Sequence, residues 1–143
     1  MKGKFFESFF GKKRYIIICA VVLVLVIVLC IFVFGDSTKR KKVELENELK
    51  SLGKDFYENF YYDLVVNSNG VESIKKYETT GIKVDLDNLS RQNNENKEKV
   101  KDFVNDKNEE CSKTNTKVII YPKDPYGKTN YELQIQLDCG FEK

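Results

Sequence analysis

The chain has no histidine and no tryptophan, and its 143 residues include two prolines and one methionine. Without histidine it lacks the commonest general base, so Ser-His-Asp and Cys-His triads are excluded, as are zinc sites that need imidazole. The sequence also contains no P-loop, GxSxG or GxGxxG motif. We therefore expect a protein that is not an enzyme and that uses no metal or cofactor.

The composition is that of a chain able to fold, with 41% hydrophobic, 32% charged and 13% aromatic residues. The formal net charge of +2 comes from cations in the first part of the chain, and beyond Lys42 acidic residues outnumber basic ones. A mildly acidic segment offers no cationic surface to a phosphate backbone. We expect one modest domain and no nucleic-acid partner.

Residues 15–34 read YIIICAVVLVLVIVLCIFVF, a run without a charge, an amide or a proline. A helix needs about 20 such residues to cross the hydrocarbon core of a bilayer. A cleaved signal peptide is the main alternative, but residues 32–36 offer no small-x-small cleavage site. A lipoprotein reading through Cys30 fails because Leu29 stands where a small residue is required. The run predicts an uncleaved signal anchor.

Flanking charge discriminates poorly between the two orientations of this span, because basic residues occur on both sides of it. They are Lys2, Lys4, Lys12, Lys13 and Arg14 before the run, and Lys39, Arg40, Lys41 and Lys42 after it. The longer C-terminal side carries two cysteines, which suits an oxidising compartment. We therefore expect a single-pass protein of the cell membrane with its N-terminus in the cytoplasm and its domain outside.

Four segments follow from this interpretation. We expect a basic, Phe-rich cytoplasmic tail at 1–14, the transmembrane anchor at 15–34, a basic juxtamembrane stem at 35–42 and an extracytoplasmic domain at 43–143. The lipid bilayer is then one partner, through the transmembrane helix. A protein of the envelope is a second possible partner.

The domain begins with a predicted amphipathic helix over residues 43–65. Its apolar stripe has helical spacing and consists of Leu45, Leu49, Leu52, Phe56, Phe60 and Leu64. Gly53 interrupts the helix at a cost of about 1 kcal/mol. A core-facing helix is the favoured interpretation, and a coiled-coil stalk is the alternative.

The remainder of the domain predicts short helices and strands. A short helix is expected at 71–78, an edge strand at 82–86, and an exposed helix or mobile arm at 93–108. Asp85, Asp87 and Asn88 look like the start of a calcium loop without its glycine and twelfth-position glutamate, and a cap or turn explains them better. The β-rich run at 118–121 and the alternating run at 131–141 predict a β-hairpin packed on the first helix. The predicted fold class is α+β.

Cys111 and Cys139 are the two cysteines beyond the apolar run. A disulfide between them closes a loop of about 29 residues and stabilises by roughly 3.5 kcal/mol in the chain-entropy model. Reduced thiols on the cytoplasmic side are one alternative. A redox pair is another, although CxxC spacing is absent.

Tyr57, Tyr61 and Tyr62 form the remaining candidate site. They lie in one aromatic run with Phe56 and Phe60, and all three cannot easily face the core together. Exposed tyrosines are frequent in protein interfaces. We therefore name these three residues as a candidate partner surface, with core packing as the alternative.

Three segments carry a resemblance to known proteins: LGKDFYENFYYD at 52–63, GVESIKKYETTGIKVDLDNLSR at 70–91, and CGFE at 139–142. The exported part resembles single-pass, membrane-anchored extracytoplasmic proteins of AT-rich Gram-positive bacteria, a group to which no function is attached. A hydrophobic N-terminal helix followed by a hairpin and a C-terminal disulfide is also similar to type IV pilins and pseudopilins. Here, however, Gly11 is followed by Lys12, Lys13 and Arg14.

The expected function is that of a non-enzymatic interaction or structural module of the bacterial cell envelope. Two alternatives stay open. One is a pilin-like or pseudopilin-like assembly subunit, as the second resemblance implies. The other is an envelope enzyme without a recognisable motif.

Overall fold

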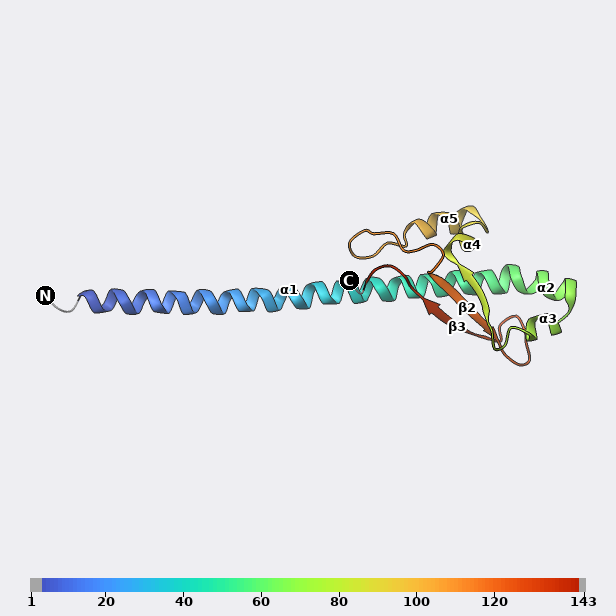
Figure 1. Cartoon of the computed structure of the whole chain (residues 1–143), viewed down its shortest axis with the longest axis horizontal. Helices are drawn as coiled ribbons and strands as arrows, with labels where there is room; N and C mark the ends of the chain where they lie inside the picture. The colour runs from blue at the N-terminus through green and yellow to red at the C-terminus, as the bar shows by residue number, and fades with distance from the viewer. Residues whose placement is uncertain (1–3, 142–143) are drawn as a thin grey trace. The chain divides into compact units, whose positions relative to one another are not determined.

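The computed structural model describes the backbone of residues 4–141 and the side chains in that range except those of 4–19 and 31–36. The helices are α1 (Lys4–Phe56), the π-helix η1 (Tyr57–Tyr61), α2 (Tyr62–Asn69), α3 (Glu72–Lys75), α4 (Leu86–Ser90) and α5 (Asn94–Lys101). The strands are β1 (Ile82–Asp85), β2 (Lys117–Pro122) and β3 (Tyr131–Gln136). These elements confirm the predicted α+β class (Figure 1).

The chain divides into two compact units, Met1–Ser37 and Thr38–Lys143. In the first unit, the large apolar side chains from Val21 to Leu29 are between 42% and 62% exposed. Among the described residues, no helix is both long and apolar enough to cross a membrane. The predicted span at 15–34 includes side chains that lie outside the described residues, and so does the predicted tail at 1–14.

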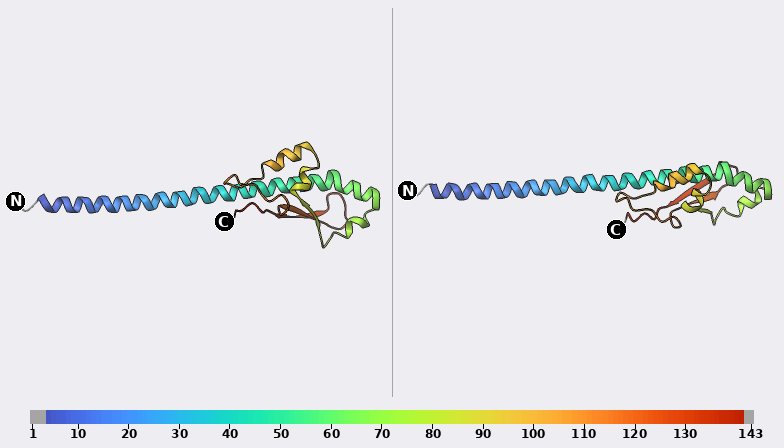
Figure 2. Two further views of the ribbon diagram at one scale, coloured as in Figure 1. Left: turned by 45° about the horizontal axis from the view of Figure 1, so that its top comes forward. Right: turned by 90° about the horizontal axis from the view of Figure 1, so that it is seen from above.

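The second unit is built on the C-terminal part of α1. Leu45, Leu49 and Leu52 recur at helical spacing and are at most 3% exposed, so this part of the helix has one fully buried face. The face packs against a three-stranded antiparallel sheet of order β1-β2-β3. Figure 2 shows β2 and β3 alongside the C-terminal part of α1 in two further views. The predicted packing of the hairpin on the helix is confirmed.

The inner face of the sheet follows from its register. Ile82 of β1 lies opposite Ile120 of β2, and Val84 lies opposite Val118. All four side chains are at most 7% exposed, whereas the alternate residues of β3 on the same face are only half-buried. The core is therefore centred on β2, and β1 and β3 form the two edges.

Gly53 allows the helix to approach the sheet closely. A Cβ atom at this position would lie 2.7 Å from each of the two γ-methyl groups of Val118. Neither the helix nor β2 has room for such a group, because Val118 is completely buried. The glycine that looks like a defect in the amphipathic stripe is thus the contact point between α1 and the centre of the sheet.

The segment between β1 and β2 covers one end of the core. Asp85 caps the N-terminus of α4 by accepting a hydrogen bond from the Asn88 N–H at 2.8 Å. Asn93 caps α5 in the same way through the Asn96 N–H at 2.7 Å. Helix α5 is the helical part of the polar segment 93–108, and it is fixed to the core by Val100, which is 7% exposed.

Candidate functional site

The π-helix η1 changes which aromatic residues face the core. A π-helical turn closes hydrogen bonds between residues five apart instead of four, so it rotates the following side chains relative to an α-helix. Tyr57 is completely buried, whereas Phe60 is 48% exposed and Leu64 is 56% exposed. The prediction that Phe60 and Leu64 continue the buried stripe is therefore wrong, because it assumes an unbroken α-helical period.

The structure places the three candidate tyrosines in different environments. Tyr57 belongs to the core and is not available to a partner, while Tyr61 and Tyr62 are half-buried and pack against the same core. The ring of Tyr57 lies 4.9 Å from that of Tyr131 in an edge-on arrangement, measured between centroids. It also contacts Tyr62 edge-on at 5.9 Å. This geometry favours packing as the main role of Tyr57.

The hydroxyl groups of this cluster differ in their partners. Tyr131 donates a hydrogen bond to Glu58 at 2.7 Å. The pKa of Tyr131 is raised above its ordinary value, mainly because the side chain is buried and also because of this hydrogen bond. The hydroxyl of Tyr57 is buried and has no hydrogen-bond partner within the described part of the chain. Burial raises the pKa of Tyr57 to about 12. Both groups are therefore neutral at physiological pH.

Phe60 and Leu64 form an exposed apolar surface that sequence reasoning missed. They follow Phe56 at intervals of four residues, and the rings of Phe56 and Phe60 lie 5.8 Å apart, measured between centroids. Half-exposed phenylalanine and leucine side chains can contact an apolar partner. The signal for this surface is the run of aromatic residues itself, which contains more large side chains than one helix face can bury.

Cys111 and Cys139 form a disulfide, as the sequence predicts. Asn105 supports the bridge: its side-chain amide donates hydrogen bonds to the Cys139 carbonyl and to Glu109, both at 2.8 Å. The side-chain oxygen of Asn105 accepts from the backbone N–H groups of Lys107 and Glu109, both at 2.9 Å. The bridge and this buried amide together fix the loop after α5 to the end of the chain.

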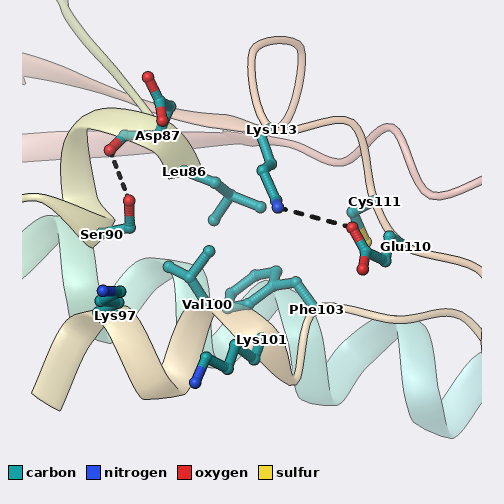
Figure 3. Close-up of a pocket in the computed structure, with 10 residues that line it drawn as sticks. All are labelled: Leu86, Asp87, Ser90, Lys97, Val100, Lys101, Phe103, Glu110, Cys111 and Lys113. Atoms are coloured by element: carbon teal, nitrogen blue, oxygen red, sulfur yellow. Dashed lines mark hydrogen bonds and ion pairs between the residues drawn. The ribbon is translucent and has the colours of Figure 1, made fainter.

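A cavity of about 220 Å³ lies between α4, α5 and the segment that contains Cys111. Figure 3 shows the side chains of Leu86, Val100 and Phe103 converging on it, with Lys113 extending across. The charged end of Lys113 pairs with Glu110 at 3.6 Å, on the rim. The interior is thus lined mainly by apolar atoms.

The rim of this cavity offers little for acid–base chemistry. Ser90 donates its hydroxyl proton to the Asp87 carbonyl at 2.7 Å, and the Asp87 carboxylate pairs with Arg91 at 2.6 Å. No group of three or more acidic, cysteine or histidine side chains able to hold a metal occurs in the described part of the chain. Asp85 caps the N-terminus of α4, in which Asp87 and Asn88 lie. The prediction that these three residues form a cap or turn is therefore confirmed.

Comparison of the chain with models of protein families, with curated proteins and with solved structures finds no match.

Proposed function

We propose that this protein is a single-pass, membrane-anchored module of the bacterial cell envelope, which acts outside the membrane by contact rather than by catalysis. The observation that carries the proposal is the exposed apolar surface of α1. Val21 to Leu29 present side chains that are 42% to 62% exposed, and no side chain of the described chain covers them. Such a surface on one helix matches the hydrocarbon of a bilayer.

The sequence around these residues supports the same proposal. The apolar run extends over 15–34, about the length that a bilayer requires. Cations precede and follow it, where they can meet lipid headgroups.

The disulfide supports an extracytoplasmic location of the domain. Structural disulfides persist in oxidising compartments and are rare where thiol reductants are abundant. The bridge between Cys111 and Cys139 is buried, with each cysteine 4% exposed, and it closes a domain that has a small core. This role fits a stabilising crosslink of an exported domain.

The proposal of membrane anchoring is tested by washing membranes of cells that express the full chain with alkaline carbonate. An integral protein stays in the pellet, whereas a peripheral one moves to the supernatant. A variant with Val24→Lys and Val26→Lys places two charges in the apolar run, each at a cost of about 2.5–3.5 kcal/mol at the centre of a membrane helix. We expect the wild type in the pellet and a reduced pelleted fraction of the variant; release of the wild type would contradict the proposal.

A second candidate, a pilin-like assembly subunit, is favoured by one observation. The C-terminal part of the long helix α1 packs on an antiparallel sheet, and a disulfide lies near the end of the chain. This candidate requires cleavage after Gly11 and assembly into filaments that sediment. Sequencing of the mature N-terminus decides it, because an intact N-terminus excludes processing at this glycine.

A further inference from the structure

Four consecutive basic residues, Lys39, Arg40, Lys41 and Lys42, form a basic stem on α1. Because successive residues of an α-helix are 100° apart, the four side chains leave the helix in different directions. Lys41 pairs with Glu44 at 3.4 Å. The side-chain amines of Lys39 and Lys42 have no hydrogen bond or ion pair with any residue that the structure describes. The stem thus retains cationic charge for an external partner.

An apolar residue lies beside these cations. Val43 is 53% exposed, although it is large and apolar. It lines a shallow hollow on α1 together with Lys39, Arg40, Glu44 and Asn47. Glu44 is the acidic group of this hollow, and Lys41 offsets its charge. The surface therefore combines hydrogen-bond donors of positive charge with one apolar contact.

The cations of this stem fit a phospholipid headgroup, which carries a phosphate at the membrane surface. Lysine and arginine donate strong hydrogen bonds to phosphate oxygens. An anionic lipid keeps its net charge at the surface, whereas the phosphate of a zwitterionic lipid is neutralised by its own amine.

The position of the stem along the chain agrees with such a ligand, on the premise of the membrane anchoring proposed above. Lys39 follows the apolar run by five residues, which is about 7.5 Å along a helix. The headgroup layer extends about 5–7.5 Å beyond the hydrocarbon on each side. Lysine side chains can reach back toward the membrane from positions slightly above it.

We propose that the basic stem binds the headgroups of anionic phospholipids and surrounds the anchor with such lipids. The purified full-length chain in detergent micelles is titrated with phosphatidylglycerol and, separately, with phosphatidylcholine of the same acyl chains. Bound lipids are counted by native mass spectrometry. We expect phosphatidylglycerol to bind at least severalfold more tightly than phosphatidylcholine.

The test variant is Lys39→Gln with Lys42→Gln. One lysine near an anionic surface contributes about fivefold, the equivalent of about 1 kcal/mol, so this variant lowers the affinity for phosphatidylglycerol by about 25-fold. The matched control is Lys50→Gln with Lys54→Gln, which removes the same charge from two exposed residues farther along α1. We expect less than about a twofold effect of the control, since it lies beyond the reach of the headgroups.

Equal affinity of the wild type for the two lipids overturns the inference, and so does an equal loss in both variants, which would indicate a general effect of charge. Displacement of the lipid by glycerol 3-phosphate would also overturn it, because the site would then recognise a free phosphate. Retention of the wild type after the carbonate wash, together with equal lipid affinities, contradicts the lipid inference alone. Release in that wash contradicts the membrane anchoring on which the inference rests.

Discussion

Gly53→Ala tests whether the close approach of α1 to the sheet is required for the stability of the domain. In an exposed helix this substitution stabilises by about 1 kcal/mol, because alanine has the higher helix propensity. Here the added methyl group would lie 2.7 Å from both γ-methyl groups of Val118. Valine is stiff at χ1, and Val118 is held on the central strand of the sheet, so neither group can move aside without displacing backbone.

The two effects have opposite signs, and their magnitudes decide the outcome. Overpacking of a well-packed core costs about 1–3 kcal/mol, and a clash with two methyl groups of a stiff side chain belongs at the upper end. The net expectation is a loss of about 2 kcal/mol, or a decrease of Tm of roughly 10 °C for a domain of this size. Urea unfolding of the purified chain, followed by the near-UV circular dichroism of its tyrosines, measures the difference.

A control and a double-mutant cycle make the test specific. Ser51→Ala lies on the exposed face of the same helix and should stabilise by up to about 0.5 kcal/mol through propensity alone. Val118→Ala removes the methyl groups that clash, so it should cost less in the Gly53→Ala background than in the wild type, by about 1–2 kcal/mol. If Gly53→Ala stabilises as Ser51→Ala does, the close contact does not exist.

Three further outcomes follow from the core and the bridge. Tyr57→Phe removes a buried hydroxyl that has no partner in the described part of the chain. We expect the free energy of unfolding to stay unchanged or to rise by up to about 1 kcal/mol. A marked loss of stability would indicate that this hydroxyl makes a hydrogen bond. The pKa values of Tyr57 and Tyr61 are both raised to about 12, chiefly by burial, from 10.0. Their contribution to stability is therefore complete below about pH 10 and is lost as the pH rises towards 12, and a urea midpoint that stays constant over this interval would contradict it. Replacing Cys111 and Cys139 by serine should lower the free energy of unfolding by about 3.5 kcal/mol, whereas an unchanged midpoint would show that the bridge does not form.

The parts of the fold that depend on local periodicity could be predicted from the sequence. Alternation of apolar residues located β1 and the first part of β3, a continuous β-rich run located β2, and helical spacing located the buried stripe at Leu45, Leu49 and Leu52. Strand β3 ends at Gln136 rather than continuing to the end of the alternating run. There the chain turns toward the disulfide: the Ser112 N–H donates to the carbonyl of Asp138 at 2.7 Å.

The aromatic segment could not be predicted in the same way, because periodicity assumes one helical geometry. The π-helix at Tyr57–Tyr61 rotates the side chains that follow, so that Tyr61 and Val65 pack against the core in place of Phe60 and Leu64. Whether a helix contains such a turn depends on tertiary packing, and Tyr57 at its start packs against Tyr131 of the sheet. This contact joins residues that are far apart in the sequence.

Gly53 shows the same limit for a single residue. A glycine within an amphipathic stripe indicates either a weak point or a close approach, and propensity alone favours the first. Only the position of Val118 on β2, which packs against the helix at this point, identifies the close approach. The disulfide, by contrast, could be predicted without geometry, because only two cysteines follow the apolar run.

Labelling of Cys111 and Cys139 in intact cells tests whether the disulfide-closed domain lies outside the membrane. A membrane-impermeant maleimide is applied before and after reduction to a variant in which Cys19 and Cys30 are replaced by alanine. For a domain outside the membrane, we expect both cysteines to be labelled in intact cells after reduction and neither before it. Labelling that requires lysis of the cells and needs no reduction would place the domain in the cytoplasm.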